Sequence, residues 1–95
     1  MNKTIIEDWE FEIVVTKGIA DQCRMGFETG DTFSCKYECP TGFCPKTMTT
    51  LHTLCEIARC GGDYKLRGSK LSNEVDFICA DGCVEFHLIA KQLEV

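Results

Sequence analysis

The feature that most constrains this chain is its cysteine content, eight cysteines in 95 residues. A small chain of this kind is held together by disulfides, is built around a metal, or packs its thiols into an ordinary core. The cysteines are Cys23, Cys35, Cys39, Cys44, Cys55, Cys60, Cys79 and Cys83. Disulfide scaffolds need an oxidising compartment, and residues 1–9 contain no apolar segment of signal-peptide length. We therefore expect a cytoplasmic protein whose thiols are reduced or bound to metal.

Composition bounds the size of the protein and the partners it can have. A chain of 95 residues predicts a single domain, residues 1–95, with a thin core that a metal or a crosslink would help to stabilise. The formal net charge of -5 argues against a nucleic-acid partner, which would require a basic surface. No apolar run approaches the ~20 residues of a membrane span, so we expect no membrane partner either.

Hydrophobic periodicity predicts an α+β domain. Four segments alternate apolar and polar residues with the period of a half-buried strand. Between the second and third lies a helical apolar stripe, which begins near Pro45 and stops at Gly61-Gly62. The predicted strands are 9–16, 32–37, 75–79 and 83–90, the predicted helix runs from Pro45 or Thr47 to Arg59, and 63–74 is a predicted extended loop. This order predicts a small, mostly antiparallel β-β-α-β-β sheet with one helix packed on one face.

The last two strands are predicted to form a hairpin around Asp81-Gly82, a strong two-residue turn signal. The resulting register puts Cys79 at the end of the apolar face of the hairpin. A step of one residue reverses the side, so Cys83 is expected to point to the other face and not to pair with Cys79. The same register sets Asp76 opposite His87 on the outer face, as a solvent-side pair.

Four further residues have ordinary structural roles as their simplest interpretation. Cys35 belongs to the apolar face of the second strand and Cys55 to the apolar stripe of the helix, so both are predicted to fill the core. Cys60 is predicted to cover the end of the helix. His52 lies one turn before Cys55 and is predicted to be an exposed helix histidine.

The remaining four cysteines are candidates for a metal site. Cys23 lies in the first long loop, Cys39 and Cys44 flank the turn before the helix, and Cys79 ends the third strand. Four thiolates from three segments suit zinc or an iron–sulfur cluster, and the helix dipole would favour a thiolate at Cys44. The C-x4-C spacing differs from the C-x2-C knuckle of structural zinc sites. Zinc or an iron–sulfur cluster is the predicted cofactor, and packing of bare thiols is the competing interpretation.

Two other functions fit the same residues. In a thiol-redox protein, Cys44 would attack and Cys39 or Cys23 would resolve, although the chain has no Cys-x-x-Cys. In a plain interaction module the cysteines would only pack. No Ser/His/Asp arrangement, phosphate-binding loop or paired-carboxylate motif stands out, so no catalytic residue is predicted. The acidic charge suits a redox accessory protein that docks on a larger redox enzyme, and self-association is the other partner considered.

Short motifs along most of the chain resemble a family of small, uncharacterised prokaryotic proteins of under a hundred residues. Each motif is weak alone, but their order and spacing from Val14 to Ile89 are fairly specific. The motifs read Cys23-Arg24-Met25-Gly26, Gly30-Asp31-Thr32-Phe33, Pro40-Thr41-Gly42-Phe43-Cys44, Gly61-Gly62 and Cys79-Ala80-Asp81.

The resemblance implies a shared set of site residues but no established activity. That set is Cys23, Cys44, Cys79 and Asp81, whereas Cys39 is intermediate and the other cysteines look particular to this protein. A site of three thiols with Asp81 or an open position therefore competes with the four-cysteine site. Three protein ligands and an open position are typical of a catalytic metal.

Overall fold

The structure, a computed structural model, describes residues 9–18, 23, 25–36, 39–79 and 82–93. These residues form an α+β domain in the predicted β-β-α-β-β order, with one short 3₁₀ helix added. The elements are β1 (Trp9–Gly18), β2 (Thr32–Cys35), α1 (Met48–Arg59), η1 (Tyr64–Arg67), β3 (Glu74–Ile78) and β4 (Val84–Gln92).

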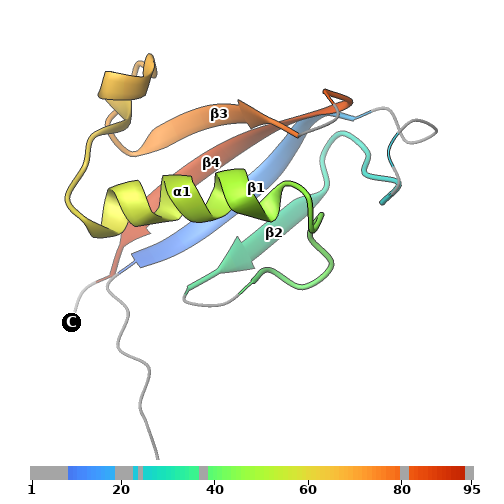
Figure 1. Cartoon of the computed structure of the whole chain (residues 1–95), viewed down its shortest axis with the longest axis horizontal. Coiled ribbons are helices and arrows are strands. Elements are labelled where there is room, and N and C mark those ends of the chain that lie inside the picture. Colours follow the sequence, from blue (N-terminus) through green and yellow to red (C-terminus); the bar gives the residue numbers. More distant parts are fainter. Residues whose placement is uncertain (1–8, 19–22, 24, 37–38, 80–81, 94–95) are drawn as a thin grey trace, which may run out of the picture.

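The four strands make one antiparallel sheet in the order β2-β1-β4-β3 (Figure 1). The first and last strands are its central pair, with Phe11 opposite Ala90 and Ile13 opposite Leu88. The two edge strands, β2 and β3, are consecutive in the chain apart from the helical segment between them. The chain must therefore cross the sheet between these edges, and α1 lies in that crossing.

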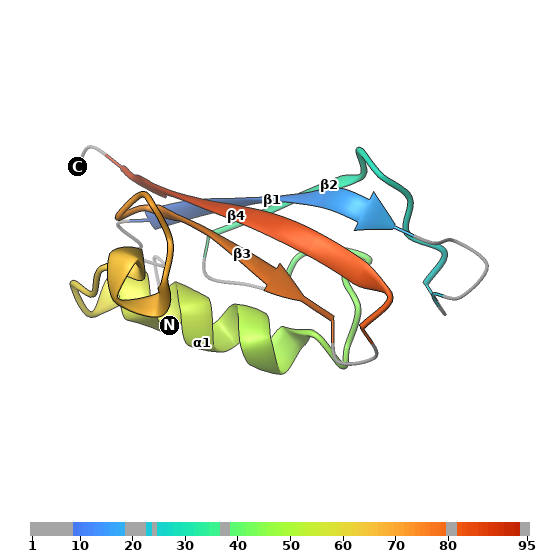
Figure 2. The same cartoon turned by 90° about the horizontal axis from the view of Figure 1, so that it is seen from above.

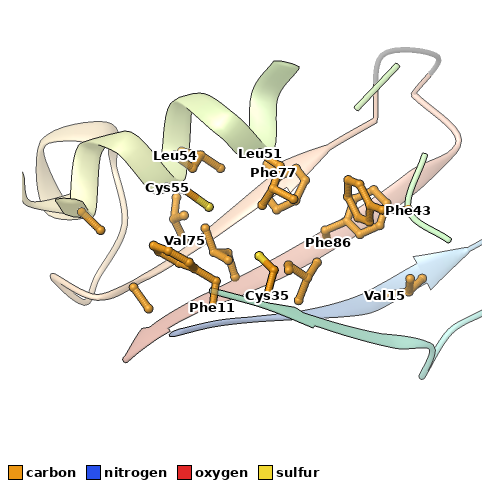
Figure 3. Packing of buried hydrophobic residues seen from close by; sticks show 14 of the residues in the cluster. Phe11, Val15, Cys35, Phe43, Leu51, Leu54, Cys55, Val75, Phe77 and Phe86 are labelled. Atoms are coloured by element: carbon orange, nitrogen blue, oxygen red, sulfur yellow. The ribbon is translucent and has the colours of Figure 1, made fainter. Parts of the chain in front are cut away.

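Helix α1 covers one face of the sheet, and no helix of the described residues covers the other face (Figure 2). The inward residues of the strands and the apolar stripe of the helix form the core (Figure 3). Phe11, Ile13 and Val15 are fully buried, as their alternation in the sequence predicts. α1 has 12 residues, and no helix in the described part of the chain is long and apolar enough to cross a membrane.

The β3–β4 pair has the register predicted from the sequence. Phe77 lies opposite Phe86 on the inner face, and their rings stack with centroids 4.9 Å apart. On the outer face Asp76 lies opposite His87, whose Nδ1 is 2.6 Å from Asp76 Oδ1. The His87 Nε2 atom is also 2.7 Å from Glu74 Oε1. His87 is therefore fixed between two carboxylates, one more than the register alone predicted.

The segment 63–74, predicted to be an extended loop, contains η1 instead. The Asp63 side chain accepts a hydrogen bond from the Lys65 backbone N–H at the start of η1. Tyr64 is buried, and its hydroxyl donates to the Leu54 carbonyl of α1 at 2.6 Å. One buried tyrosine in a polar stretch thus anchors the segment to the helix, and a single residue of this kind creates no periodicity that sequence analysis would detect.

Candidate functional site

All eight cysteines are free thiols, and they differ in burial. Cys35 and Cys55 are buried in the core, as predicted, and Cys39 and Cys60 are exposed. The other four are half-buried and pack against the edge of the core. These four are Cys23, Cys44, Cys79 and Cys83.

The four half-buried cysteines line one hollow, which we call the hairpin hollow. Its lining residues are Cys23, Met25, Cys44, Pro45, Lys46, Cys79 and Cys83. They come from three segments that are distant in the sequence: the loop after β1, the turn before α1, and the β3–β4 turn. The last two of these segments lie at the same end of the sheet in both views of the molecule (Figures 1 and 2). The fold therefore brings together Cys23, Cys44 and Cys79, three of the predicted site residues.

The position of Cys44 is set by the start of the helix. The backbone N–H groups of Thr47 and Met48 both donate to the Cys44 carbonyl, at 3.1 and 3.2 Å. Cys44 thus precedes the first helical turn, and the buried Phe43 beside it fixes this turn to the core. The positive end of the helix dipole favours negative charge near this position, which stabilises a thiolate.

Cys79 and Cys83 flank the β3–β4 turn. The Cys79 N–H donates to the Val84 carbonyl at 2.9 Å, which extends the predicted register beyond Ile78. The Gly82 N–H donates to the Cys79 carbonyl at 2.9 Å, and Gly82 has a positive φ of 75°. The Cys83 N–H donates to Cys79 Sγ at 3.2 Å. Backbone hydrogen bonds to sulfur of this kind surround the cysteine ligands of metal centres.

The predicted separation of Cys79 from Cys83 does not hold at the hairpin hollow, because both residues line it. The prediction extended strand parity through Cys83, but β4 begins at Val84. Cys83 belongs to the turn, where the alternation of sides no longer applies. Two cysteines that flank a tight Asp-Gly turn were the signal in the sequence that would have indicated this proximity.

Cys39 lies elsewhere. It lines a second hollow, which we call the helix hollow, beside the face of α1. The residues of the helix hollow are Cys35, Cys39, Met48, Leu51, His52, Cys55, Glu56 and Arg59. Cys39 and Cys44 flank one turn in the sequence, yet they line different hollows. Asp81, the other predicted ligand, lies outside the described residues.

The thiols of the hairpin hollow are near one another but are not arranged as a closed ligand set. Among the residues that the structure describes, no three His, Cys, Asp or Glu side chains stand together in a geometry that would hold a metal ion. A role of these cysteines in metal binding therefore stays a prediction.

Comparisons of the chain with family models, with curated protein sequences and with solved structures find no match. The resemblance to small prokaryotic cysteine-containing proteins also stays a prediction.

Proposed function

We propose that the protein binds a thiolate-coordinated metal centre, zinc or an iron–sulfur cluster, in the hairpin hollow. The ligands are Cys23, Cys44, Cys79 and Cys83. One observation supports this most strongly: four cysteines from three segments of the chain line one hollow. A core that only needed small apolar residues has no reason to gather half of its cysteines at one end of the sheet.

The donor set suits soft and borderline metals. Cysteine thiolates select zinc, copper(I) and iron–sulfur clusters over magnesium and calcium. In a tetrahedral zinc site with Zn–S bonds of about 2.3 Å, the four sulfurs stand about 3.8 Å apart. Each cysteine has a single side-chain torsion before its sulfur, so inward rotation of the four side chains is the movement by which the metal closes the site.

The surroundings of the hollow favour thiolates. Four thiolates around one Zn²⁺ leave a net charge of -2, which the protein must offset. Cys44 lies at the positive end of α1, Cys79 Sγ accepts the Cys83 N–H, and Lys46 also lines the hollow. Each of these lowers the free energy of the charged ligand set.

A metal at this position would tie together three segments that are distant in the sequence: the loop after β1, the turn before α1 and the β3–β4 turn. The first two already meet in the core, where the ring centroids of Phe27 and Phe43 lie 6.3 Å apart. A domain of 95 residues buries a modest fraction of its surface, so a metal that ties three segments together contributes directly to folding.

Elemental analysis of protein purified without air or chelator tests the proposal. We expect about one equivalent of zinc in a colourless protein, or iron and sulfide in a brown one. Cys44→Ser and Cys83→Ser should each lower the metal content about tenfold, because each removes one ligand.

Two matched variants separate this site from other thiols. Cys39→Ser and Cys60→Ser change exposed cysteines outside the hairpin hollow, and both should keep the metal. Loss of metal from Cys39→Ser but not from Cys83→Ser would overturn the proposed ligand set. Wild-type protein without zinc or iron in any preparation would overturn the function itself.

A further inference from the structure

A second group of thiols surrounds the helix hollow, and two of them touch. Cys35 is the last residue of β2, and Cys55 lies on the inner face of α1. Only 6% of Cys35 and 4% of Cys55 are exposed. Their sulfurs project toward each other between strand and helix (Figure 3), and the two thiols are hydrogen-bonded. This contact is one that two residues acting only as core filler do not require.

The pair lies beneath a solvent-accessible thiol. Cys39 is exposed and lines the helix hollow together with Cys35 and Cys55. Cys35 and Cys39 also line a further hollow, together with Glu10, Ser34, Lys36 and Thr41. The two cysteines therefore share the lining of two hollows, and a reagent in solvent reaches the exposed Cys39 before it reaches the buried pair.

An arginine and a glutamate of α1 line the helix hollow together. Arg59 lines the hollow, and its guanidinium donates to the Lys36 carbonyl and to Glu56 Oε1, each at 2.6 Å. The same group lies over the Phe11 ring, 5.2 Å from the ring centroid. These contacts fix the guanidinium, paired with Glu56, at the hollow that the three thiols line.

Cys55 itself is shielded from direct reaction with a disulfide in solvent. Its hydrogen bond with Cys35 and its burial both raise the pKa of the Cys55 thiol far above its ordinary value of 9.0. Burial also keeps a disulfide reagent in solvent away from Cys55, because thiol–disulfide exchange requires contact between the attacking sulfur and the disulfide. Oxidation of the pair therefore needs an exposed thiol as an intermediate.

We propose that Cys35 and Cys55 form a reversible disulfide between β2 and α1, and that Cys39 transfers the oxidation from a small-molecule disulfide to the buried pair. This inference is independent of the metal centre proposed above. It uses none of the cysteines of the hairpin hollow.

Three exchange steps carry the reaction. The Cys39 thiolate attacks the reagent RSSR, forms a Cys39–SR bond and releases RS⁻. Cys35 then attacks the Cys39 sulfur, forms a Cys35–Cys39 bond and releases the second RS⁻. Cys55 attacks the Cys35 sulfur and restores Cys39 as a thiol. Overall, two protein thiols lose two electrons and two protons, and RSSR becomes two RSH.

Tryptic peptide mapping tests the proposal on the full-length protein, because trypsin separates the two buried cysteines cleanly. Cys35 is the only cysteine of peptide 25–36, and Cys55 is the only cysteine of peptide 47–59. Reduced protein is exposed to glutathione disulfide under argon, quenched with an alkylating agent, digested and analysed by mass spectrometry. We expect a linked 25–36/47–59 species that disappears on treatment with a thiol reductant.

Three variants give the experiment its controls. Cys55→Ala should abolish the linked species, and Cys39→Ser should slow its formation about tenfold or more because the accessible nucleophile is missing. Cys60→Ser changes an exposed cysteine outside the helix hollow and should leave the rate unchanged. The proposal is wrong if Cys35 and Cys55 both stay alkylatable in wild type, or if Cys39→Ser forms the link as fast as wild type. The metal content of the same samples shows separately whether the hairpin hollow binds a metal.

Discussion

His87 shows how one residue can carry a pH response on an otherwise ordinary sheet surface. Its two ring nitrogens face Asp76 and Glu74 on β3, at 2.6 and 2.7 Å. Burial by itself lowers the pKa of His87, but the hydrogen bonds and charges of the two carboxylates outweigh it, so the pKa is raised above 6.5. His87 therefore binds its proton more tightly in the folded protein than in the unfolded chain.

The direction of the pH dependence follows from the sign of this shift. A pKa raised by folding gives a stabilisation that is complete below the unfolded pKa of 6.5 and is lost as the pH rises through the folded pKa. We expect the free energy of unfolding to fall between about pH 6 and pH 8. Urea unfolding across this range measures it, and His87→Gln should flatten the curve. An equal slope in wild type and His87→Gln would contradict the assignment to His87.

Among the elements, the end of α1 is fixed by a local sequence signal that needs no tertiary contacts. Beyond the C-cap residue Cys60, the Gly61 N–H donates to the Ala58 carbonyl and the Gly62 N–H donates to the Ile57 carbonyl. These two bonds form a Schellman motif, which needs a residue with positive φ after the C-cap. Gly61 has a φ of 80°, so the predicted stop at Gly61-Gly62 is confirmed with its mechanism.

The two glycines should respond differently to alanine. A Cβ at Gly61 meets nothing within 4 Å. Gly61→Ala should therefore lower the free energy of unfolding only through backbone strain at positive φ, by about 1 kcal/mol. A Cβ at Gly62 would lie 2.7 Å from the Ile57 carbonyl oxygen, so Gly62→Ala must also shift the helix end and should cost more. Chemical denaturation of both variants measures the difference. A smaller loss for Gly62→Ala than for Gly61→Ala would contradict this account of the helix end.

The elements themselves were largely predictable, and the site was predictable only in part. Alternation indicated the strands, and the hairpin register fixed the Asp76–His87 pair because cross-strand neighbours follow from a turn and a period of two. The same rule failed at Cys83, since a residue in a turn has no parity. Cys39 and Cys44 were predicted to share one site because they flank one short turn, but in the structure they line different hollows.

Across the whole molecule, the eight cysteines divide into two groups that line separate hollows and one outlying thiol. Cys35, Cys39 and Cys55 line the helix hollow, four more line the hairpin hollow, and Cys60 follows α1. We propose different chemistry for each of the two groups. The helix hollow holds a buried dithiol beneath an exposed thiol, and the hairpin hollow holds four half-buried thiols from segments that a metal would tie together.

X-ray absorption at the edge of the bound metal decides whether the hairpin hollow is the metal centre, because it counts the sulfur atoms around the metal. We expect a coordination shell composed of sulfur, with four sulfurs at about 2.3 Å if the metal is zinc. Zinc reconstituted into Cys83→Ser at high concentration should show three. A first shell dominated by nitrogen and oxygen, or a sulfur count that Cys39→Ser lowers and Cys83→Ser leaves unchanged, would contradict the claim that the hairpin hollow is the metal centre.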